Sequence, residues 1–440
     1  MPQSFLARPG AALSGSIRVP GDKSISHRSI MLGAIAEGTT RVTGFLEGAD
    51  AISTMNVFRA MGVQIEGPDE GRVTVHGVGL HGLKAPTVPL DCGNAGTSMR
   101  LLSGLLAGQG FAATLVGDES LSTRPMRRVI DPLTQMGARI DSKEGRPPLQ
   151  IHPVPSLAGI TYNMPMASAQ VKSSLMLAGL YAQGETRITE PAPTRDHTER
   201  MLTAFGVKVD VKGSTVSVKG GQTLKATDID VPSDISSAAF FLVAGAIARD
   251  SDVIVRHVGV NPTRTGIIDI LRLMGANLTL ENPRTVGGEP VADLRVRTST
   301  LKGIHVPPEL VPLAIDEFPI LFIAAACSQG RTVVTGAEEL RVKESDRIAV
   351  MADGLKRLGI DCTPTEDGMI IEGRGEQAQV FSGGVVDSHG DHRPAMSFAV
   401  ASLRASAPIS IQNTLNVGTS FPNFLELANS VGIDVARVDG

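Results

Sequence analysis

A short phrase recurs six times along the chain and fills its length. An apolar residue, a glycine and a second apolar residue meet at Gly62, Gly137, Gly206, Gly275, Gly359 and Gly432, which lie 69 to 84 residues apart. Each glycine follows a helical pattern, where a residue without a Cβ suits a left-handed helix end. The first copy predicts strands at 16–19, 39–45, 63–65 and 72–75 and helices at 26–36 and 51–61. Because solenoid repeats are about 20–50 residues long, these longer units favour an α/β fold of two domains, with three units in each.

The pattern restarts at two points, Val19-Pro20-Gly21 and Val231-Pro232-Ser233. We therefore expect one domain at residues 21–231, and a second made of residues 1–20 plus 232–440. The two crossovers near residues 20 and 232 would form a hinge, and ligand sites favour domain interfaces. The alternative is a rigid α/β array without a cleft.

Composition excludes several classes of protein. The net charge is -4, aromatic residues are 3% and Trp is absent, so nucleic acid is not an expected partner. The three cysteines have no zinc-ligand spacing, which argues against a disulfide scaffold and a cysteine metal site. No apolar run reaches the ~18 residues that span a bilayer, and the first residues lack a signal-peptide pattern. We expect a soluble, cytoplasmic protein with no membrane partner.

Basic residues gather where the predicted helices begin. Examples are Lys23, Arg28, Arg100, Lys172, Arg124, Arg195, Arg264, Arg347 and Arg393. A cation is disfavoured at a helix N-terminus because the helix dipole is positive there. The arrangement makes sense if an anion binds at these helix starts, where free N–H groups and cations act together. The alternative for any one residue is a solvated surface cation.

These segments resemble the 5-enolpyruvylshikimate-3-phosphate synthase family, and its class II branch in particular. The matching segments, in chain order, are GDKSISHRS, GNAGTSMR, STRPM, SAQVK, RDHTE, NPTRTG, IDEFP, ELRVKESDR and DHRPAMSF. The resemblance implies an inside-out α/β barrel fold of two similar domains, each of three βαβαββ repeats. It implies transfer of the enolpyruvyl group of phosphoenolpyruvate to the 5-hydroxyl of shikimate 3-phosphate, with release of phosphate. It further implies a monomer that uses no metal and no organic cofactor.

The resemblance also assigns roles to residues. Those implied to bind shikimate 3-phosphate are Lys23, Ser24, Arg28, Ser168, Ala169, Gln170, Arg195, Asp316 and Lys343. Those implied to bind phosphoenolpyruvate are Lys23, Asn94, Gly96, Arg124, Gln170, Arg347 and Arg393. Asp316 is implied to be the base that takes the hydroxyl proton. Glu344 leads as the acid that protonates the methylene carbon, with Lys23 as the alternative.

Two departures and two rival functions stay open. Some relatives have Lys where this chain has Gly418, and herbicide-insensitive relatives carry Ala at the position of Gly96. One rival is the related transferase that acts on UDP-N-acetylglucosamine, which usually has a Cys in the loop that here reads GDESLST, from Gly117. The other is a non-catalytic protein that closes on phosphorylated ligands. His27, His197 and His392 are interpreted as packing or capping residues.

Overall fold

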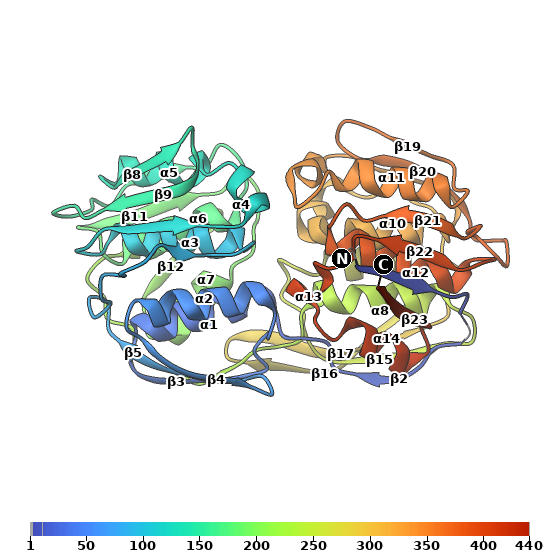
Figure 1. The fold of residues 1–440 in the computed structure, drawn as a ribbon, viewed down its shortest axis with the longest axis horizontal. Helices are drawn as coiled ribbons and strands as arrows, with labels where there is room; N and C mark the ends of the chain where they lie inside the picture. The colour runs from blue at the N-terminus through green and yellow to red at the C-terminus, as the bar shows by residue number, and fades with distance from the viewer. Residues whose placement is uncertain (1–2, 11, 440) are drawn as a thin grey trace. The chain divides into compact units, whose positions relative to one another are not determined.

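The computed structural model describes residues 3–10 and 12–439, and they fall into two compact units. The first unit comprises Gly21–Val231 with Val286–Gly288, and the second comprises Met1–Pro20, Pro232–Thr285 and Glu289–Gly440. Each unit has helices within and sheets around them (Figure 1). The predicted hinge at the two crossovers stays a prediction.

Three four-stranded sheets enclose the first unit, and each has one parallel pair followed by antiparallel strands. The first sheet has the order β14 (Ile229–Asp230), β3 (Glu37–Thr43), β5 (Arg72–Val78) and β4 (Gln64–Asp69). The second is β6 (Leu90–Asp91), β7 (Ala113–Val116), β9 (Arg146–His152) and β8 (Arg139–Lys143). The third is β10 (Thr161–Asn163), β11 (Glu185–Thr189), β13 (Thr215–Lys219) and β12 (Val209–Lys212).

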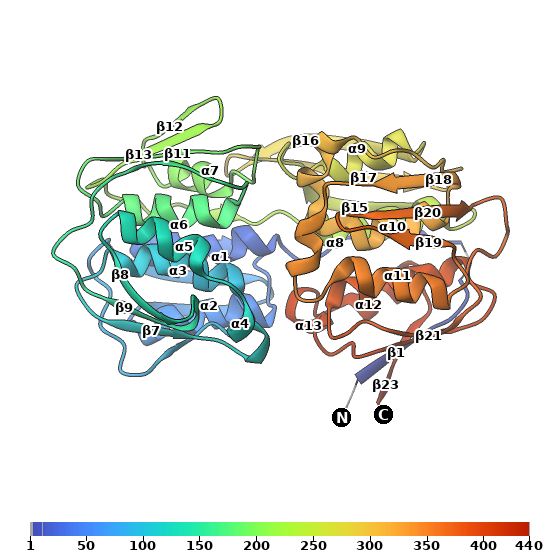
Figure 2. The same ribbon diagram turned by 90° about the horizontal axis from the view of Figure 1, so that it is seen from above.

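Two kinds of helix accompany these sheets (Figure 2). The inner helices, buried over most of their length, are α1 (Lys23–Ile35), α3 (Gly96–Ala107) and α6 (Ala169–Gly179). The outer ones are α2 (Ala49–Ala60), the short α4 (Glu119–Thr123), α5 (Arg127–Gln135) and α7 (His197–Ala204). Helices α3 and α6 approach so closely that a Cβ on Gly104 would lie 1.9 Å from the carbonyl oxygen of Ser174. A glycine is therefore needed at this contact.

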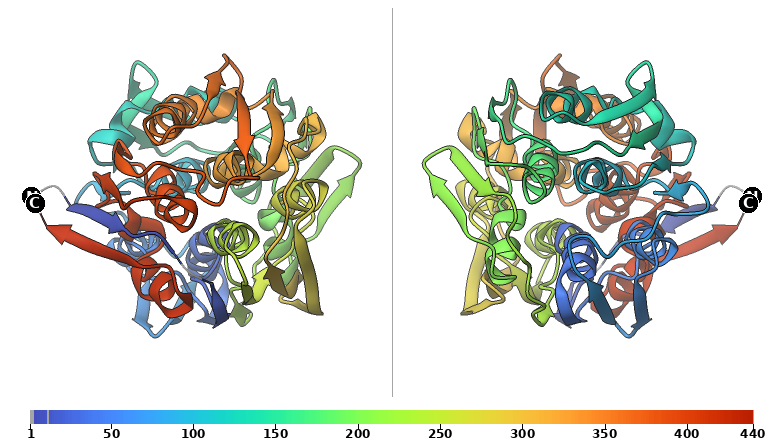
Figure 3. Two further views of the ribbon diagram at one scale, coloured as in Figure 1. Left: turned by 90° about the vertical axis from the view of Figure 1, so that its right-hand side faces the viewer. Right: turned by 90° about the vertical axis from the view of Figure 1, so that its left-hand side faces the viewer.

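The second unit repeats the plan (Figure 3). Its sheets have the orders β16 (Asn277–Val286), β17 (Glu289–Arg297), β15 (Asp252–Gly259), β2 (Ser14–Ile17); β18 (Gln329–Val334), β20 (Met369–Arg374), β19 (Cys362–Pro364); and β21 (Gly384–Asp387), β22 (Ile409–Gln412), β1 (Gln3–Ala7), β23 (Val435–Asp439). In the three-stranded sheet, the parallel strand is reduced to the isolated bridges Lys302–Gln329 and His305–Val333.

The helices of this unit follow the same division. The buried inner helices are α8 (Ile235–Ile247), α10 (Phe318–Ala326) and α12 (His392–Ala401). The outer ones are α9 (Gly266–Leu273), α11 (Arg347–Arg357), the short α13 (Val417–Ser420) and α14 (Phe424–Val431). Short 3-10 helices are η1 (Pro308–Leu310), η2 (Pro312–Glu317), η3 (Glu338–Val342) and η4 (Ser402–Arg404).

The six repeat glycines share one conformation. Their φ angles lie between 83° and 109°, and each follows the end of an outer helix: α2, α5, α7, α9, α11 and α14. This is the left-handed region that a side chain would strain, so the recurring glycine has a physical cause. The α/β class and the sixfold repeat predicted from the sequence are confirmed. In the first copy, the predicted element boundaries differ from the observed ones by up to four residues.

Strands distant in sequence complete two of the sheets. Strand β2, before the first crossover, pairs in parallel with β15 of the second unit, and β14, before the second crossover, pairs in parallel with β3 of the first. Each strand thus belongs to the unit that the chain is about to leave. Across the described ranges, no helix combines the length and apolar character needed to cross a membrane.

Candidate active site

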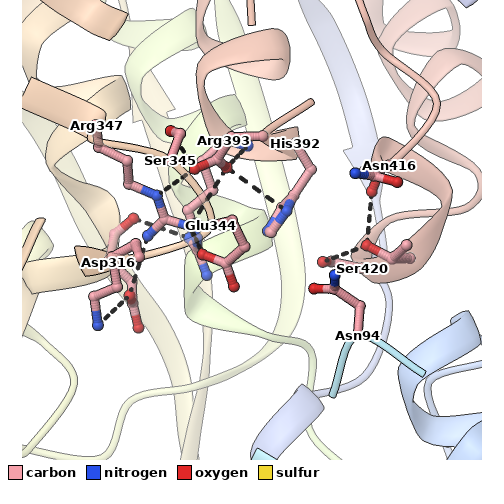
Figure 4. A network of polar contacts seen from close by, with 12 residues as sticks. Asn94, Asp316, Glu344, Ser345, Arg347, His392, Arg393, Asn416 and Ser420 are labelled. Atoms are coloured by element: carbon pink, nitrogen blue, oxygen red, sulfur yellow. Dashed lines mark hydrogen bonds and ion pairs between the residues drawn. The ribbon is translucent and has the colours of Figure 1, made fainter. Parts of the chain in front are cut away.

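A buried arginine is the centre of the polar network in the second unit. Arg347 is the first residue of α11, and its side chain is 1% exposed. Its Nε donates to Asp391 Oδ2 at 2.8 Å, its Nη2 donates to Glu344 Oε2 at 2.6 Å, and its Nη1 lies 3.4 Å from Asp316 Oδ1 (Figure 4). Burial opposes the charge, but the three carboxylates outweigh it and raise the pKa of Arg347. The cation is therefore fixed and already paired.

Asp391 joins the starts of two helices. It is the N-cap of α12, where Oδ1 accepts the backbone N–H of Arg393 at 3.0 Å, and Oδ2 also accepts the hydroxyl of Ser345 at 2.9 Å. The carboxylate is fully buried. Burial acts to raise its pKa, but the charge of Arg347, with a smaller contribution from His392 and the hydrogen bond to Arg347, prevails and lowers it. Asp391 therefore stays ionised and holds α11 against α12.

Asp316 presents its carboxylate to two cations. It lies in η2, directly before α10, with Lys343 Nζ at 3.5 Å from Oδ1 and Arg347 Nη1 at 3.4 Å. Its backbone oxygen accepts a hydrogen bond from Arg393 Nη1 at 3.0 Å. The structure thus brings together Asp316, Lys343, Glu344, Arg347 and Arg393, all of which the sequence marked. Asp316 and Glu344 thus share one guanidinium, each at a different terminal nitrogen.

In the first unit, Lys23 begins α1 and forms an ion pair with Asp50, a buried residue in the first turn of α2. Asp22 caps α1 by accepting the N–H of Ile25 at 2.8 Å, which fixes the helix start that carries Lys23. Ser24 follows Lys23 and is partly buried, and its carbonyl oxygen accepts from Arg28.

Gly96 lies close to the guanidinium groups of Arg100 and Arg124. It is the first residue of α3, and a Cβ there would lie 3.2 Å from Nη1 of both Arg100 and Arg124. Arg124 Nη2 donates to Asn94 Oδ1 at 2.7 Å, and Asn94 in turn donates to Asp118 at 2.8 Å. The absence of a side chain at residue 96 therefore leaves space directly beside two cations.

Gln170 belongs to the same group. Its Oε1 accepts from Arg100 Nη1 at 2.6 Å and its Nε2 donates to Thr97 at 2.9 Å, which links the starts of α6 and α3. Ser168 is the N-cap of α6, accepting the N–H of Val171 at 3.3 Å, and Ala169 is the first residue of that helix. Asn94, Gly96, Arg124 and Gln170 are therefore neighbours, as their implied common ligand requires.

Arg28 is buried among hydroxyl groups. Its Nε donates to Thr198 Oγ1 at 2.7 Å, its Nη2 donates to Ser173 Oγ at 2.8 Å, and its Nη1 donates to the carbonyl of Ser24 at 3.0 Å. Arg195, partly buried, lies two residues before α7, on the loop that leads to Thr198. Sequence reasoning gave no role to Thr198 and Ser173, although Thr198 lies within the segment RDHTE and Ser173 directly follows SAQVK.

Lys172 corrects one expectation. Its side chain is 1% exposed, and Nζ lies 2.7 Å from Oε1 of both Glu190 and Glu199. This helix-start cation is therefore buried and has two carboxylates of the protein as its partners. The carboxylates responsible lie 18 and 27 positions along the chain, in segments whose partners the sequence did not reveal.

The histidines in these motifs are buried. Burial, together with Lys23, lowers the pKa of His27 to about 3, and its Nδ1 lies 2.8 Å from the hydroxyl of Thr54. Burial lowers the pKa of His392 to about 4 against the opposing charge of Asp391. Both rings are neutral near pH 7. In the part of the chain that the structure describes, no group of three or more His, Cys, Asp or Glu residues could hold a metal ion.

Comparisons with known proteins agree on one family. The family model described as EPSP synthase (3-phosphoshikimate 1-carboxyvinyltransferase) matches residues 7–427. A protein of that name from Methylococcus capsulatus is 65% identical, over 98% of each chain, and one from Alkalilimnicola ehrlichii is 64% identical, over 99% of this chain and 97% of its own. A solved EPSP synthase structure from Acinetobacter baumannii superposes with a TM-score of 0.91 at 61% identity, covering 99% of this chain and all of that one.

Proposed function

Since the chain belongs to the EPSP synthase family, we propose that the polar groups described above form its active site. The enzyme transfers the enolpyruvyl group of phosphoenolpyruvate to shikimate 3-phosphate, and its relatives are named for this carboxyvinyl transfer to 3-phosphoshikimate. The rival activity on UDP-N-acetylglucosamine has no support among these relatives. The residue assignments that follow are proposals about how this chain performs the reaction.

The observation that carries the proposal is the sharing of Arg347 by Asp316 and Glu344. Asp316 takes the proton of the 5-hydroxyl of shikimate 3-phosphate, while the hydroxyl oxygen forms a bond to the enol carbon of phosphoenolpyruvate. An acid protonates the methylene carbon at the same time, which gives a tetrahedral adduct. The bond to phosphate then breaks, and the methyl group returns a proton as the double bond re-forms. The methyl proton goes back to the acid, and the hydroxyl proton held by Asp316 passes to the departing phosphate, so protons and electron pairs balance without any further reactant.

Glu344 is the stronger candidate for the acid. In the free protein its carboxylate pairs with Arg347 Nη2 at 2.6 Å. If a phosphoenolpyruvate anion takes that guanidinium, Glu344 loses its cation and faces a new negative charge. Both changes favour the protonated carboxylic acid. Lys23 is the alternative, since its ammonium group carries a proton and its contact with Asp50 fixes its position.

Substrate binding uses the remaining assigned residues. We propose that Asn94, Gly96, Arg124 and Gln170, together with Lys23, Arg347 and Arg393, bind phosphoenolpyruvate. Shikimate 3-phosphate is assigned to Ser24, Arg28, Ser168, Ala169, Gln170, Arg195 and Lys343, with Lys23 and Asp316. Because these residues belong to both units, the assignment requires the units to close on the substrates about the crossovers near residues 20 and 232. We further propose that the protein is a cytoplasmic monomer.

Phosphate release from a mixture of both substrates tests the proposal. The wild-type protein is expected to release phosphate only when both are present, whereas a non-catalytic binding protein would release none. Asp316→Asn is expected to keep substrate affinity within several-fold and to lower turnover at least ~10²-fold, the scale of acid–base loss. Glu344→Gln is expected to lose turnover similarly with little change in KM. Near-normal turnover in Glu344→Gln would transfer the acid role to Lys23.

A further inference from the structure

The buried ammonium group of Lys172 has no part in the reaction as described above. It lies in the first turn of α6, with Glu190 and Glu199 both 2.7 Å from Nζ, and its side chain is 1% exposed. Burying two carboxylates and one ammonium group away from water costs desolvation free energy, which their attraction offsets only when the geometry is well defined. The question is therefore what this triad holds in place.

The two carboxylates mark the ends of one segment. Glu190 follows β11 directly, and Glu199 lies in the first turn of α7. Residues 191–196 between them form a loop that carries Arg195. The other oxygen of Glu190 accepts the hydroxyl of Thr194, the residue next to Arg195. Lys172 thus contacts a glutamate at each end of the loop, and one of these glutamates, Glu190, also binds Thr194, the residue before Arg195.

A second contact joins the same two helices, one residue after Lys172 in α6 and one residue before Glu199 in α7. Ser173, next to Lys172, lies 2.7 Å from Thr198, next to Glu199. These two hydroxyls are the groups that accept Nη2 and Nε of Arg28. The placement of α7 against α6 therefore sets the acceptors that orient the Arg28 guanidinium. One lysine fixes the surroundings of two arginines.

We propose that Lys172 is a positioning residue for shikimate 3-phosphate, acting through Glu190 and Glu199 on Arg195 and through the α6–α7 contact on Arg28. The inference rests on the proposed assignment of Arg28 and Arg195 to that substrate. Neither Lys172 nor the two glutamates touches substrate in this proposal. Phosphoenolpyruvate, assigned to other residues apart from Lys23 and Gln170, is expected to be little affected.

Steady-state kinetics of Lys172→Met separate this role from a general loss of structure. With phosphate release as the assay, the KM for shikimate 3-phosphate is expected to rise about tenfold, as for one weakened charge-assisted hydrogen bond. The KM for phosphoenolpyruvate, measured at saturating shikimate 3-phosphate, is expected to stay within about twofold of the wild type, since its contacts are unchanged. Lys225→Met is the matched control, because Lys225 pairs with Glu37 in the same unit but is 69% exposed. The control is expected to match the wild type.

The outcomes are distinguishable. A wild-type protein that releases no phosphate would refute the proposed activity and leave Lys172 no substrate to position. An active wild type with Lys172→Met equal to the Lys225→Met control would refute the positioning role alone. So would equal rises in both KM values, or a fall in kcat alone, which indicate general damage. If Lys172→Met does not fold, the variant Lys172→Met/Glu199→Gln removes a charge of each sign, and the same split between KM values is required of it.

Discussion

Replacing Asp391 by asparagine removes one of the three carboxylates around Arg347 while keeping the side chain's shape. Asp391 Oδ2 accepts hydrogen bonds from Arg347 Nε and from the Ser345 hydroxyl. Its Oδ1 accepts a hydrogen bond from the backbone N–H of Arg393 and a longer one, at 3.4 Å, from Arg347 Nη2. An amide has one oxygen, so in either orientation its NH₂ group faces N–H donors. At least one charge-assisted hydrogen bond is lost, which costs about 1.5–3 kcal/mol.

The loss of charge adds to this cost. Removing the sole partner of a buried ion costs about 3–5 kcal/mol, but Glu344 and Asp316 still contact Arg347 in the variant. We therefore expect the low end of that range, about 3 kcal/mol in total. Since every 1.4 kcal/mol is tenfold, backbone amides of α11 and α12 that exchange through local opening should exchange about 100-fold faster.

Hydrogen exchange measured by mass spectrometry tests this at two pH values. The folded pKa of Asp391 is lowered, so its contribution is complete above the unfolded value of about 3.9 and is lost as the pH falls toward the folded value. The difference between wild type and Asp391→Asn should be constant near pH 7 and shrink below about pH 4. Equal exchange in the two proteins at pH 7, or a difference that does not depend on pH, would refute the reasoning.

A surface ion pair of the second unit supplies the control. Glu372 accepts from Arg331 Nε at 2.6 Å, as short as the Arg347–Glu344 contact, but both side chains are substantially exposed. Glu372→Gln is expected to cost less than about 1 kcal/mol, because water screens exposed pairs. A cost equal to that of Asp391→Asn would show that burial does not set the scale.

Two further predictions concern ligands. In Gly96→Ala the new methyl group lies 3.2 Å from Nη1 of both Arg100 and Arg124, so both guanidinium groups must shift by a few tenths of an ångström. The KM for phosphoenolpyruvate should rise about tenfold, and the KM for shikimate 3-phosphate should change little. Equal changes in both KM values would contradict the assignment. Closure of the two units predicts a smaller radius of gyration when shikimate 3-phosphate and an unreactive phosphoenolpyruvate analogue are both added, and X-ray scattering that shows the same radius with and without ligands would count against it.

The sequence predicts the repeat well because the repeat has a local cause. The glycine after each outer helix adopts a positive φ in all six copies. Because glycine alone adopts this conformation without strain, the residue type itself marks the end of each helix. The helical spacing of apolar residues is a local cause too: Ile348, Met351, Leu355 and Leu358 lie three or four positions apart in the fifth repeat, and all are fully buried. Element boundaries are less exact, because capping contacts decide where a helix begins.

The partners of the site residues were harder to predict, because they arise from contacts between distant segments. Arg347 and Asp391 lie 44 positions apart, and Lys172 and Glu199 lie 27 apart. A sequence shows that a cation begins a helix, but it does not show which carboxylate the fold brings to it. The sequence indicates only a capping role for Asp391, since an aspartate directly before a helix is a typical N-cap.

These pairings change how anion binding should be understood. Arg347, Lys343 and Lys23 each contact a carboxylate of the protein in the absence of substrate. If substrate anions bind these cations as proposed, each cation exchanges one partner for another, and the free energy of binding is the difference between two ion pairs. The displaced carboxylate is left beside the anion, where protonation becomes favourable. In the assignment proposed above, that carboxylate is Glu344, and the binding step itself would prepare the acid that the reaction needs. Substrate binding and acid catalysis would then be linked through the single guanidinium of Arg347.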